Sequence, residues 1–436
     1  MSLISPLFYS CLLSSIFSLK IPFSTFYYSP IATSNNFETL FFNNVNSQIC
    51  FGSQRQCLSL NIELQNPQIS VLGSSYDKAT PFEKFNEKQS QTFVKGDQLV
   101  LYRSIGEFFG EEENLYKYTA DESSDSVEIA GKKIKNFNFL TVVENTVKPK
   151  FIVNSGIIGL DLRRKNISEK STFIRQLKQN NLIDNDVFYF EYTDKENGNL
   201  IVGEYPHQRN KNLFEDNIAE TYAQDFAGEV MWGLNFEDIK YNGTSVDFNV
   251  KIGMFSIESG YIVAPSKLRQ LYLKTFFAEF IQRGLCREET TEDNGYEGFS
   301  CEDSSKVNFK NLQPISFYQR GMNFTFEFTY EELFYLYQGR KYFRICFQSD
   351  EIFDTYWFMG KPFFEKYKIY FKTDSKRIGV YKLDAPKGKN HLWIWVVTTM
   401  LIVGLLWYIV KFVLIKPRRK RAIELEDSFD YIPKNI

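Results

Sequence analysis

The chain has 436 residues, of which 43% are hydrophobic, and a formal net charge of −2. This length can bury one large two-lobed core or two smaller cores, and the near-neutral charge gives no basis for a nucleic-acid partner. Long helical heptads and internal repeats are not evident, whereas short apolar runs separated by Gly, Asn and Asp predominate. This pattern predicts a mostly β chain.

The N-terminal stretch at residues 3–19 is apolar and rich in serine, and it is short for a membrane span. We interpret residues 1–18 as a secretory signal peptide that is cleaved near Ser18. The basic residues that usually precede such a segment are missing. A short hydrophobic anchor is therefore the alternative interpretation.

A first strand is predicted at residues 37–42, and residues 48–51 and 57–62 are predicted to form a hairpin around a Gly-Ser-Gln-Arg-Gln turn. Cys50 and Cys57 flank that turn. In the oxidising compartment that a signal peptide implies, they either form a disulfide bond across the hairpin or stay as two thiols. The sequence leaves both interpretations open.

One short arrangement occurs twice in the sequence. A predicted strand ends at Glu63, and strand character resumes at residues 69–71. About two hundred residues later, an apolar run delivers Glu258 into a turn with Ser259 and Gly260, and a second apolar run leaves it. Serine can donate a hydrogen bond near the carboxylate, and glycine lets backbone approach it. An acidic residue before Ser-Gly is, taken alone, usually an ordinary solvated turn.

Residues 37–383 resemble the pepsin-like aspartic protease family through several segments in the family's order. Residues 52–56 are similar to the Gly-Thr-Pro hairpin that opens the family's first lobe, with the proline lost. Residues 85–93 resemble its Phe-x-Pro-x-x-Ser-Ser-Thr-Phe segment, and residues 156–160 its Gly-Ile-Leu-Gly-Leu segment. The most specific match is residues 357–364, Trp-Phe-Met-Gly-Lys-Pro-Phe-Phe, which resembles Trp-Ile-Leu-Gly-x-x-Phe-Leu.

The resemblance implies a mostly β, bilobal double β-barrel with a cleft between an N-terminal lobe, residues 37–185, and a C-terminal lobe, residues 186–384. In this family two aspartates, one from each lobe, share a proton, so that one acts as an acid while the other activates water. Glu63 and Glu258 stand at these two catalytic positions.

The resemblance also predicts elements around these acids. Residues 99–110 look like the flap hairpin that folds over the cleft, which places Tyr102 at the flap tyrosine position. Tyr102, Ser259 and Gly260 are then expected to contact a bound peptide. His207 follows a proline turn, and we interpret it as a surface residue. Further predicted elements are the strands at residues 125–131, 137–142, 187–192 and 198–203 and the helices at residues 172–183 and 266–280.

The two glutamates change the predicted chemistry. Each is one methylene longer than aspartate, a reach of roughly 1.5 Å, so in a site built for short side chains they either collide or turn away from the shared water. Leu64 cannot donate the hydroxyl hydrogen bond of the family's first turn, and Gln65 adds a side chain where the family has glycine. A misplacement of about 1 Å can lower a rate on the order of a hundredfold. We therefore expect a pseudoprotease that binds a peptide or protein in its cleft.

Two alternatives stay open. Both substitutions preserve charge, which favours an active acid endopeptidase with Glu63 and Glu258 as its dyad. In the third interpretation the chain is a structural membrane protein and the glutamates only fill the pocket. No cofactor is expected, and no metal, because no His/Cys cluster has ligand spacing.

The remaining cysteines and three sequons bear on secretion. The resemblance implies a disulfide bond between Cys301 and Cys346, with Cys286–Cys301 as the alternative pairing. An odd number of cysteines follows the signal peptide, so at least one thiol stays free or pairs between chains. Asn-x-Ser/Thr sequons predict glycosylation at three positions, which are Asn166, Asn242 and Asn323.

The C-terminal apolar segment, residues 392–415, contains one lysine and two threonines and is long enough to cross a bilayer. A dense run of Lys and Arg at residues 416–421 follows, and positive charge of this kind belongs on the cytoplasmic side. We therefore predict a type I single-pass protein of the secretory pathway, the cell surface or the endolysosomal system, with a cytoplasmic tail at residues 416–436. A buried soluble helix is the alternative.

Overall fold

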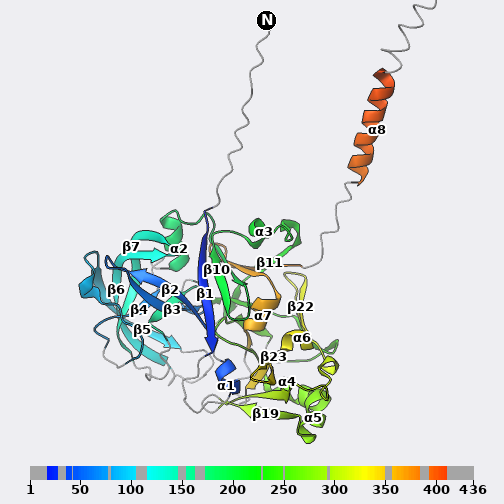
Figure 1. Cartoon of the computed structure of the whole chain (residues 1–436), viewed down its shortest axis with the longest axis horizontal. Coiled ribbons are helices and arrows are strands. Elements are labelled where there is room, and N and C mark those ends of the chain that lie inside the picture. The colour runs from blue at the N-terminus through cyan, green and yellow to red at the C-terminus, as the bar shows by residue number, and fades with distance from the viewer. Residues whose placement is uncertain are drawn as a thin grey trace, which may run out of the picture. The chain divides into compact units, whose positions relative to one another are not determined.

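The computed structural model describes residues 17–27, 36–41, 43–76, 80–104, 115–145, 154–162, 172–226, 229–248, 251–291, 295–348, 356–382 and 392–409. The chain divides into two compact units, Met1–Lys382 and Leu383–Ile436. The larger unit contains all of the described strands (Figure 1).

Strands account for most of the larger unit. In its first half they are β1 (Leu19–Tyr27), β2 (Asn43–Phe51), β3 (Gln56–Glu63), β4 (Ser70–Leu72), β5 (Val94–Ser104), β6 (Leu115–Ile129), β7 (Lys132–Asn145), β8 (Gly156–Gly159), β9 (Val187–Tyr192) and β10 (Asn197–Val202). The next group is β11 (Ile218–Tyr222), β12 (Gln224–Phe226), β13 (Glu229–Met231), β14 (Gly233–Asn235), β15 (Asp238–Tyr241), β16 (Thr244–Ser245), β17 (Ile252–Phe255) and β18 (Ile262–Ala264). The last group is β19 (Cys286–Thr290), β20 (Tyr296–Glu302), β21 (Ile315–Gln319), β22 (Phe324–Phe328), β23 (Phe334–Tyr337), β24 (Arg340–Phe343), β25 (Ile345–Gln348), β26 (Trp357–Met359), β27 (Ile369–Lys372) and β28 (Arg377–Tyr381).

Helices are short and lie between strands. They are α1 (Asn36–Phe41), α2 (Phe173–Gln179), α3 (Pro206–Arg209), α4 (Ser266–Tyr272), α5 (Ala278–Gln282), α6 (Tyr330–Leu333) and α7 (Lys361–Lys366), with a π-helical turn η6 (Leu273–Phe277) between α4 and α5. Three 3-10 turns are η1 (Glu87–Gln89), η5 (Glu215–Asn217) and η7 (Phe309–Asn311). The predicted helices at residues 172–183 and 266–280 are confirmed.

Two large sheets organise the described part of the unit. The first has 13 strands in the order β11-β28-β27-β9-β10-β1-β2-β3-β8-β4-β7-β6-β5, and the second has 9 strands along the path β14-β17-β26-β18-β25-β20-β24-β23 with β19 beside β20. In the first sheet, β27 and β28 from the end of the unit pair with β9, which comes from its middle. The mostly β prediction is confirmed.

Strand β1 was not predicted. It lies between β10 and β2 in the first sheet (Figure 1). Leu19, Ile21 and Phe23 are buried, and the residues between them are exposed, which is the period-two pattern of a strand with one face on the core. The single proline and the short length of the pattern obscured this signal in the sequence.

The predicted strand at residues 37–42 is wrong, because the chain forms helix α1 there. Phe37, Leu40 and Phe41 are all buried. Their spacing of three and four residues places them on one face of a helix, which a strand could not do. The hairpin prediction was right: β2 and β3 pair in antiparallel register, with Cys50 opposite Cys57.

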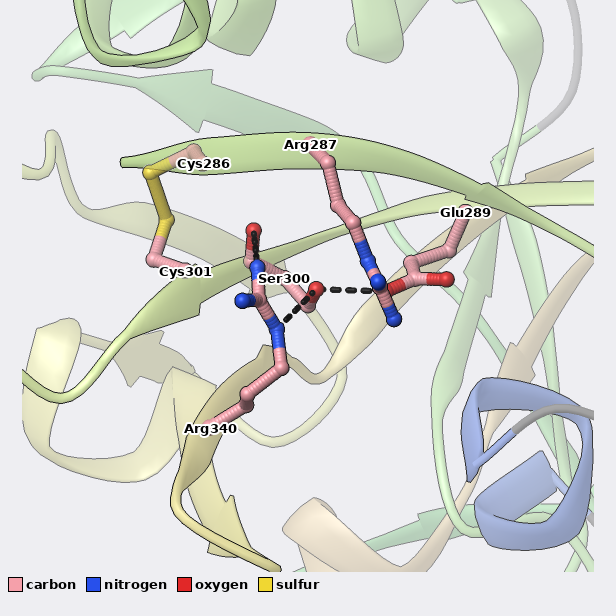
Figure 2. The surroundings of a disulfide bond; sticks show 6 residues. All are labelled: Cys286, Arg287, Glu289, Ser300, Cys301 and Arg340. Carbon is pink, nitrogen blue, oxygen red and sulfur yellow. Dashed lines mark hydrogen bonds and ion pairs between the residues drawn. A yellow bond between two sulfur atoms is a disulfide. The ribbon is translucent and has the colours of Figure 1, made fainter. Parts of the chain in front are cut away.

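The predicted Cys301–Cys346 bond is also wrong. Disulfide bonds join Cys50 to Cys57 and Cys286 to Cys301, and Cys346 is a buried free thiol. Cys286 and Cys301 are opposite each other on β19 and β20 (Figure 2). Strand β25 instead pairs Phe347 with Glu297, so Cys301 lies several residues further along β20, beyond the roughly 7 Å that a disulfide allows between Cα atoms.

In the smaller unit, helix α8 (Leu392–Ile409) has 18 residues. Judged on the residues that are described, the structure has no helix with the length and apolar character needed to span a membrane. The rest of the predicted span, residues 410–415, the tail at residues 416–436, and residues 1–16 of the predicted signal peptide lie outside the described residues.

Candidate functional site

Glu63 and Glu258 lie in equivalent places in the two sheets. Glu63 ends β3, which runs parallel to β8, and the chain returns as β4 on the other side of β8 in antiparallel register. Glu258 follows β17, which runs parallel to β26, and the chain returns as β18, antiparallel to β26. We call residues 63–66 the first acidic turn and residues 258–261 the second acidic turn. Each turn carries its glutamate across the end of a third strand.

A glycine lies under each turn. A Cβ atom on Gly159 would lie 2.2 Å from the carbonyl oxygen of Asn66, and one on Gly360 would lie 2.0 Å from that of Tyr261. In each turn this carbonyl belongs to the third residue after the glutamate. The segments 156–160 and 357–364, which the sequence singled out, therefore support the two acidic turns from below.

The Glu63 side chain is buried at 6% exposure. Its carboxylate accepts a 3.3 Å hydrogen bond from the side-chain amide of Asn61, and its backbone carbonyl accepts a 2.8 Å bond from Leu160 N–H. Leu64 is part of the hydrophobic core. The Gln65 side-chain nitrogen is buried and has no hydrogen-bond partner among the described residues. The first acidic turn thus points its second residue inward as a core side chain.

Glu258 is half-buried, and its carboxylate accepts a 3.2 Å hydrogen bond from the Ser256 hydroxyl. The Ser259 hydroxyl donates to the Tyr261 carbonyl at 2.9 Å and accepts from Tyr261 N–H at 3.2 Å. Gly260 N–H donates to Phe41 O at 2.9 Å. Ser259 and Gly260, predicted to contact a peptide, thus make hydrogen bonds within the turn and to α1.

Strand β2 connects the two acidic turns. The backbone N–H of Asn43 donates to the Glu258 carbonyl at 2.8 Å, and its side-chain amide donates to Ile257 O at 2.8 Å. Two residues along the same strand, Val45 N–H donates to the side chain of Asn61 at 3.0 Å. Residues two apart on a strand are roughly 7 Å from each other. Both turns are therefore bonded to one short stretch of β2.

Lys361, directly after Gly360, is a buried cation that sequence reasoning missed. Its side chain is 0% exposed, and its backbone N–H donates to Ser259 O at 2.8 Å. Burial, the largest cause, lowers the pKa of Lys361 to about 8, Arg344 lowers it further, and Glu365 opposes both effects. The available signal was a lysine inside the otherwise apolar run at residues 357–364. Asn43 and Asn61 carried no comparable signal.

Two other predicted residues lie elsewhere. Tyr102 is in β5, with its backbone opposite Lys117 of β6, and residues 105–114 of the predicted flap lie outside the described residues. His207 is half-buried in α3, stacks on Tyr205, and its Nδ1 lies 2.6 Å from the Tyr381 hydroxyl. Burial raises the pKa of Tyr381.

The sequon residues Asn242 and Asn323 are exposed, and both have positive φ, at 49° and 45°. Such backbone angles are typical of tight turns. Asn166 lies outside the described residues.

The sequence model of the eukaryotic aspartyl protease family matches residues 50–383. This range covers most of the chain and includes both acidic turns. The chain therefore belongs to the eukaryotic aspartyl protease family, and its larger unit is a pepsin-like aspartyl protease domain. Among curated proteins, none matches the chain.

Proposed function

We propose that this protein is a membrane-anchored pseudoprotease that binds a peptide or protein across its two acidic turns without cleaving it. The observation that carries the proposal is the contrast between scaffold and chemistry. The strand arrangement and supporting glycine of each acidic turn are kept, whereas glutamate occupies both catalytic positions and Leu64 and Gln65 occupy the first turn.

The hydrogen bonds of the two carboxylates support the loss of proteolysis. Glu63 accepts from Asn61 and Glu258 accepts from Ser256, in both cases a side chain two residues earlier. Each bond draws the carboxylate back toward its own strand. An aspartic dyad needs both carboxylates directed at one water, held to within about 0.5 Å. The longer side chain with a local partner favours the opposite orientation.

An active acid endopeptidase is the second candidate function. It is favoured by the equivalence of the two turns and by the carboxylate retained at both positions. In the third interpretation, a structural protein, the buried Glu63 only fills its pocket.

The experiment is incubation of the full-length chain with a mixed peptide library between pH 2.5 and 7, with cleavage and retention of peptides both measured by mass spectrometry. The control is Glu63→Ala with Glu258→Ala. We expect retained peptides and no new termini from the wild type, and loss of retention in the double variant. Turnover that disappears in the double variant would establish the endopeptidase, and retention by neither protein would favour the structural role.

A restored variant sharpens this test. Glu63→Asp, Leu64→Thr, Gln65→Gly and Glu258→Asp together replace the four departures from the family's acidic turns. Because the scaffold is retained, we expect this variant to cleave peptides at acid pH. Absence of cleavage from a folded restored variant would show that something other than the two turns has changed.

We further propose that residues 392–415 anchor the protein in a membrane as a type I span. The sequence supports this, and the described side chains of α8 from Met400 to Leu406 include large exposed apolar residues. Alkaline carbonate extraction tests the anchor: the full chain should stay with membranes, and a chain ending at residue 391 should be released. Release of both would reject it. Glycosidase treatment of the wild type, Asn242→Gln and Asn323→Gln tests the proposed glycans.

A further inference from the structure

Lys361 is buried at the junction of four chain segments. Its Nζ atom lies 2.7 Å from the carbonyl oxygen of Lys195 in the β9–β10 turn, 3.4 Å from the Thr25 hydroxyl on β1, and 3.5 Å from Oδ1 of Asn43 on β2. The fourth segment is its own, which begins α7. A lysine without exposed surface is rare, because burial disfavours its charged form.

These three acceptors match the ammonium group. A protonated lysine has three N–H donors and no acceptor, whereas its neutral amine has two donors. Loss of the proton therefore leaves one of the three oxygens without its lysine donor. The Asn43 Oδ1 contact, the longest of the three, is the first expected to break.

Asn43 is also the residue that holds the second acidic turn. It donates to Glu258 O and to Ile257 O, and Lys361 N–H donates to Ser259 O from the other side. The contacts thus run from the lysine ammonium through one asparagine to the backbone of the acidic residue.

We propose that Lys361 is a positioning residue whose ammonium group fixes Asn43, and through it the second acidic turn, and that loss of its proton at mildly alkaline pH loosens this turn. The inference does not depend on whether the turns bind or cleave peptide. The pH response comes from a lysine, since the two histidines of the sequence, His207 and His391, belong to other segments.

The charges around Lys361 are consistent with titration in this range. Burial and Arg344, which lies between β24 and β25, lower its pKa, while Glu365 of α7 and Glu196 and Asp194 of the β9–β10 turn raise it, with a net value of about 8. Its Nζ also lies 5.3 Å from the centre of the Tyr192 ring on β9. Burial raises the pKa of that tyrosine, so its hydroxyl stays neutral while Lys361 titrates.

The test is hydrogen–deuterium exchange of the full-length chain from pH 6.5 to 9.5, corrected for intrinsic base catalysis and read at the Asn43 and Gly260 amides. Both amides donate across the junction, to Glu258 O and to Phe41 O. In the wild type we expect their protection to fall about tenfold with a midpoint near pH 8. In Lys361→Met, which lacks the donors, we expect the lower protection at every pH.

Lys366→Met is the matched control on the same helix. Lys366 is ion-paired with Glu332 at 2.8 Å and makes no contact with Asn43 among the described interactions, so this variant should keep the wild-type midpoint. If Lys361→Met does not fold, the wild-type profile decides alone. Wild-type protection that is flat through pH 8, or a Lys361→Met profile with the same midpoint, would overturn the proposal.

Discussion

Gly159 and Gly360 lie under corresponding carbonyl groups of the two acidic turns. A Cβ atom on either would approach the third carbonyl after the acid, Asn66 O at 2.2 Å or Tyr261 O at 2.0 Å. Contacts this short with backbone cannot be relieved by rotating a side chain. The turn itself would have to move, so both glycines fix the height of a glutamate above its supporting strand.

Alanine at either glycine should therefore destabilise the domain. We expect Gly159→Ala and Gly360→Ala each to lower the free energy of unfolding by about 3 kcal/mol or more, measured by urea denaturation. Gly131→Ala is the control: its Cβ meets nothing within 4 Å, and its φ of 76° should cost only about 1 kcal/mol. Equal effects of all three substitutions would contradict the close-packing argument.

Asn61 should be a structural requirement of the first acidic turn. Asn61→Ala removes the partner of buried Val45 N–H and of the Glu63 carboxylate, which should cost about 2–4 kcal/mol. Asn46 lies opposite Asn61 in the β2–β3 pair, and its buried side-chain amide has no hydrogen-bond partner among the described residues. Asn46→Ala should therefore be nearly neutral. The two variants can be compared in one denaturation series.

Peptide mapping without reduction should recover Cys50–Cys57 and Cys286–Cys301, with Cys346 alkylated only after unfolding. Cys286→Ser with Cys301→Ser opens a link between residues 15 apart, and should cost about 3 kcal/mol. Cys346→Ala should leave both bonds intact. Recovery of a Cys301–Cys346 peptide from native protein would contradict this pairing.

The stability difference between wild type and Lys361→Met should depend on pH. The pKa of Lys361 falls from 10.5 to about 8 on folding, so between these values the unfolded chain carries a proton that the folded chain has lost. Wild-type stability relative to the variant should then rise with pH across this window, by on the order of 3 kcal/mol in total, and stay constant below pH 7. A difference that falls with rising pH would contradict the lowered pKa.

Local patterns predicted much of the fold. The β2–β3 hairpin, helix α2 and the β26–α7 segment were read correctly because each is defined by neighbouring residues, through alternation, helical spacing or a specific motif. The pattern at residues 37–42 was ambiguous, because Phe37, Leu40 and Phe41 are apolar in either state. Burial of all three on one side, against the second acidic turn, selected the helix.

The sequence by itself determined the family, the mostly β architecture and the two glutamates at the family's acid positions, because these depend on motifs and their order. Only the tertiary structure decided that Cys286 rather than Cys346 bonds Cys301, since strand register sets which Cα atoms come close. It also decided that Lys361, Asn43 and Asn61 surround the acidic turns. These residues come from segments far apart in the chain, and only pairing of the strands brings their side chains within hydrogen-bond reach.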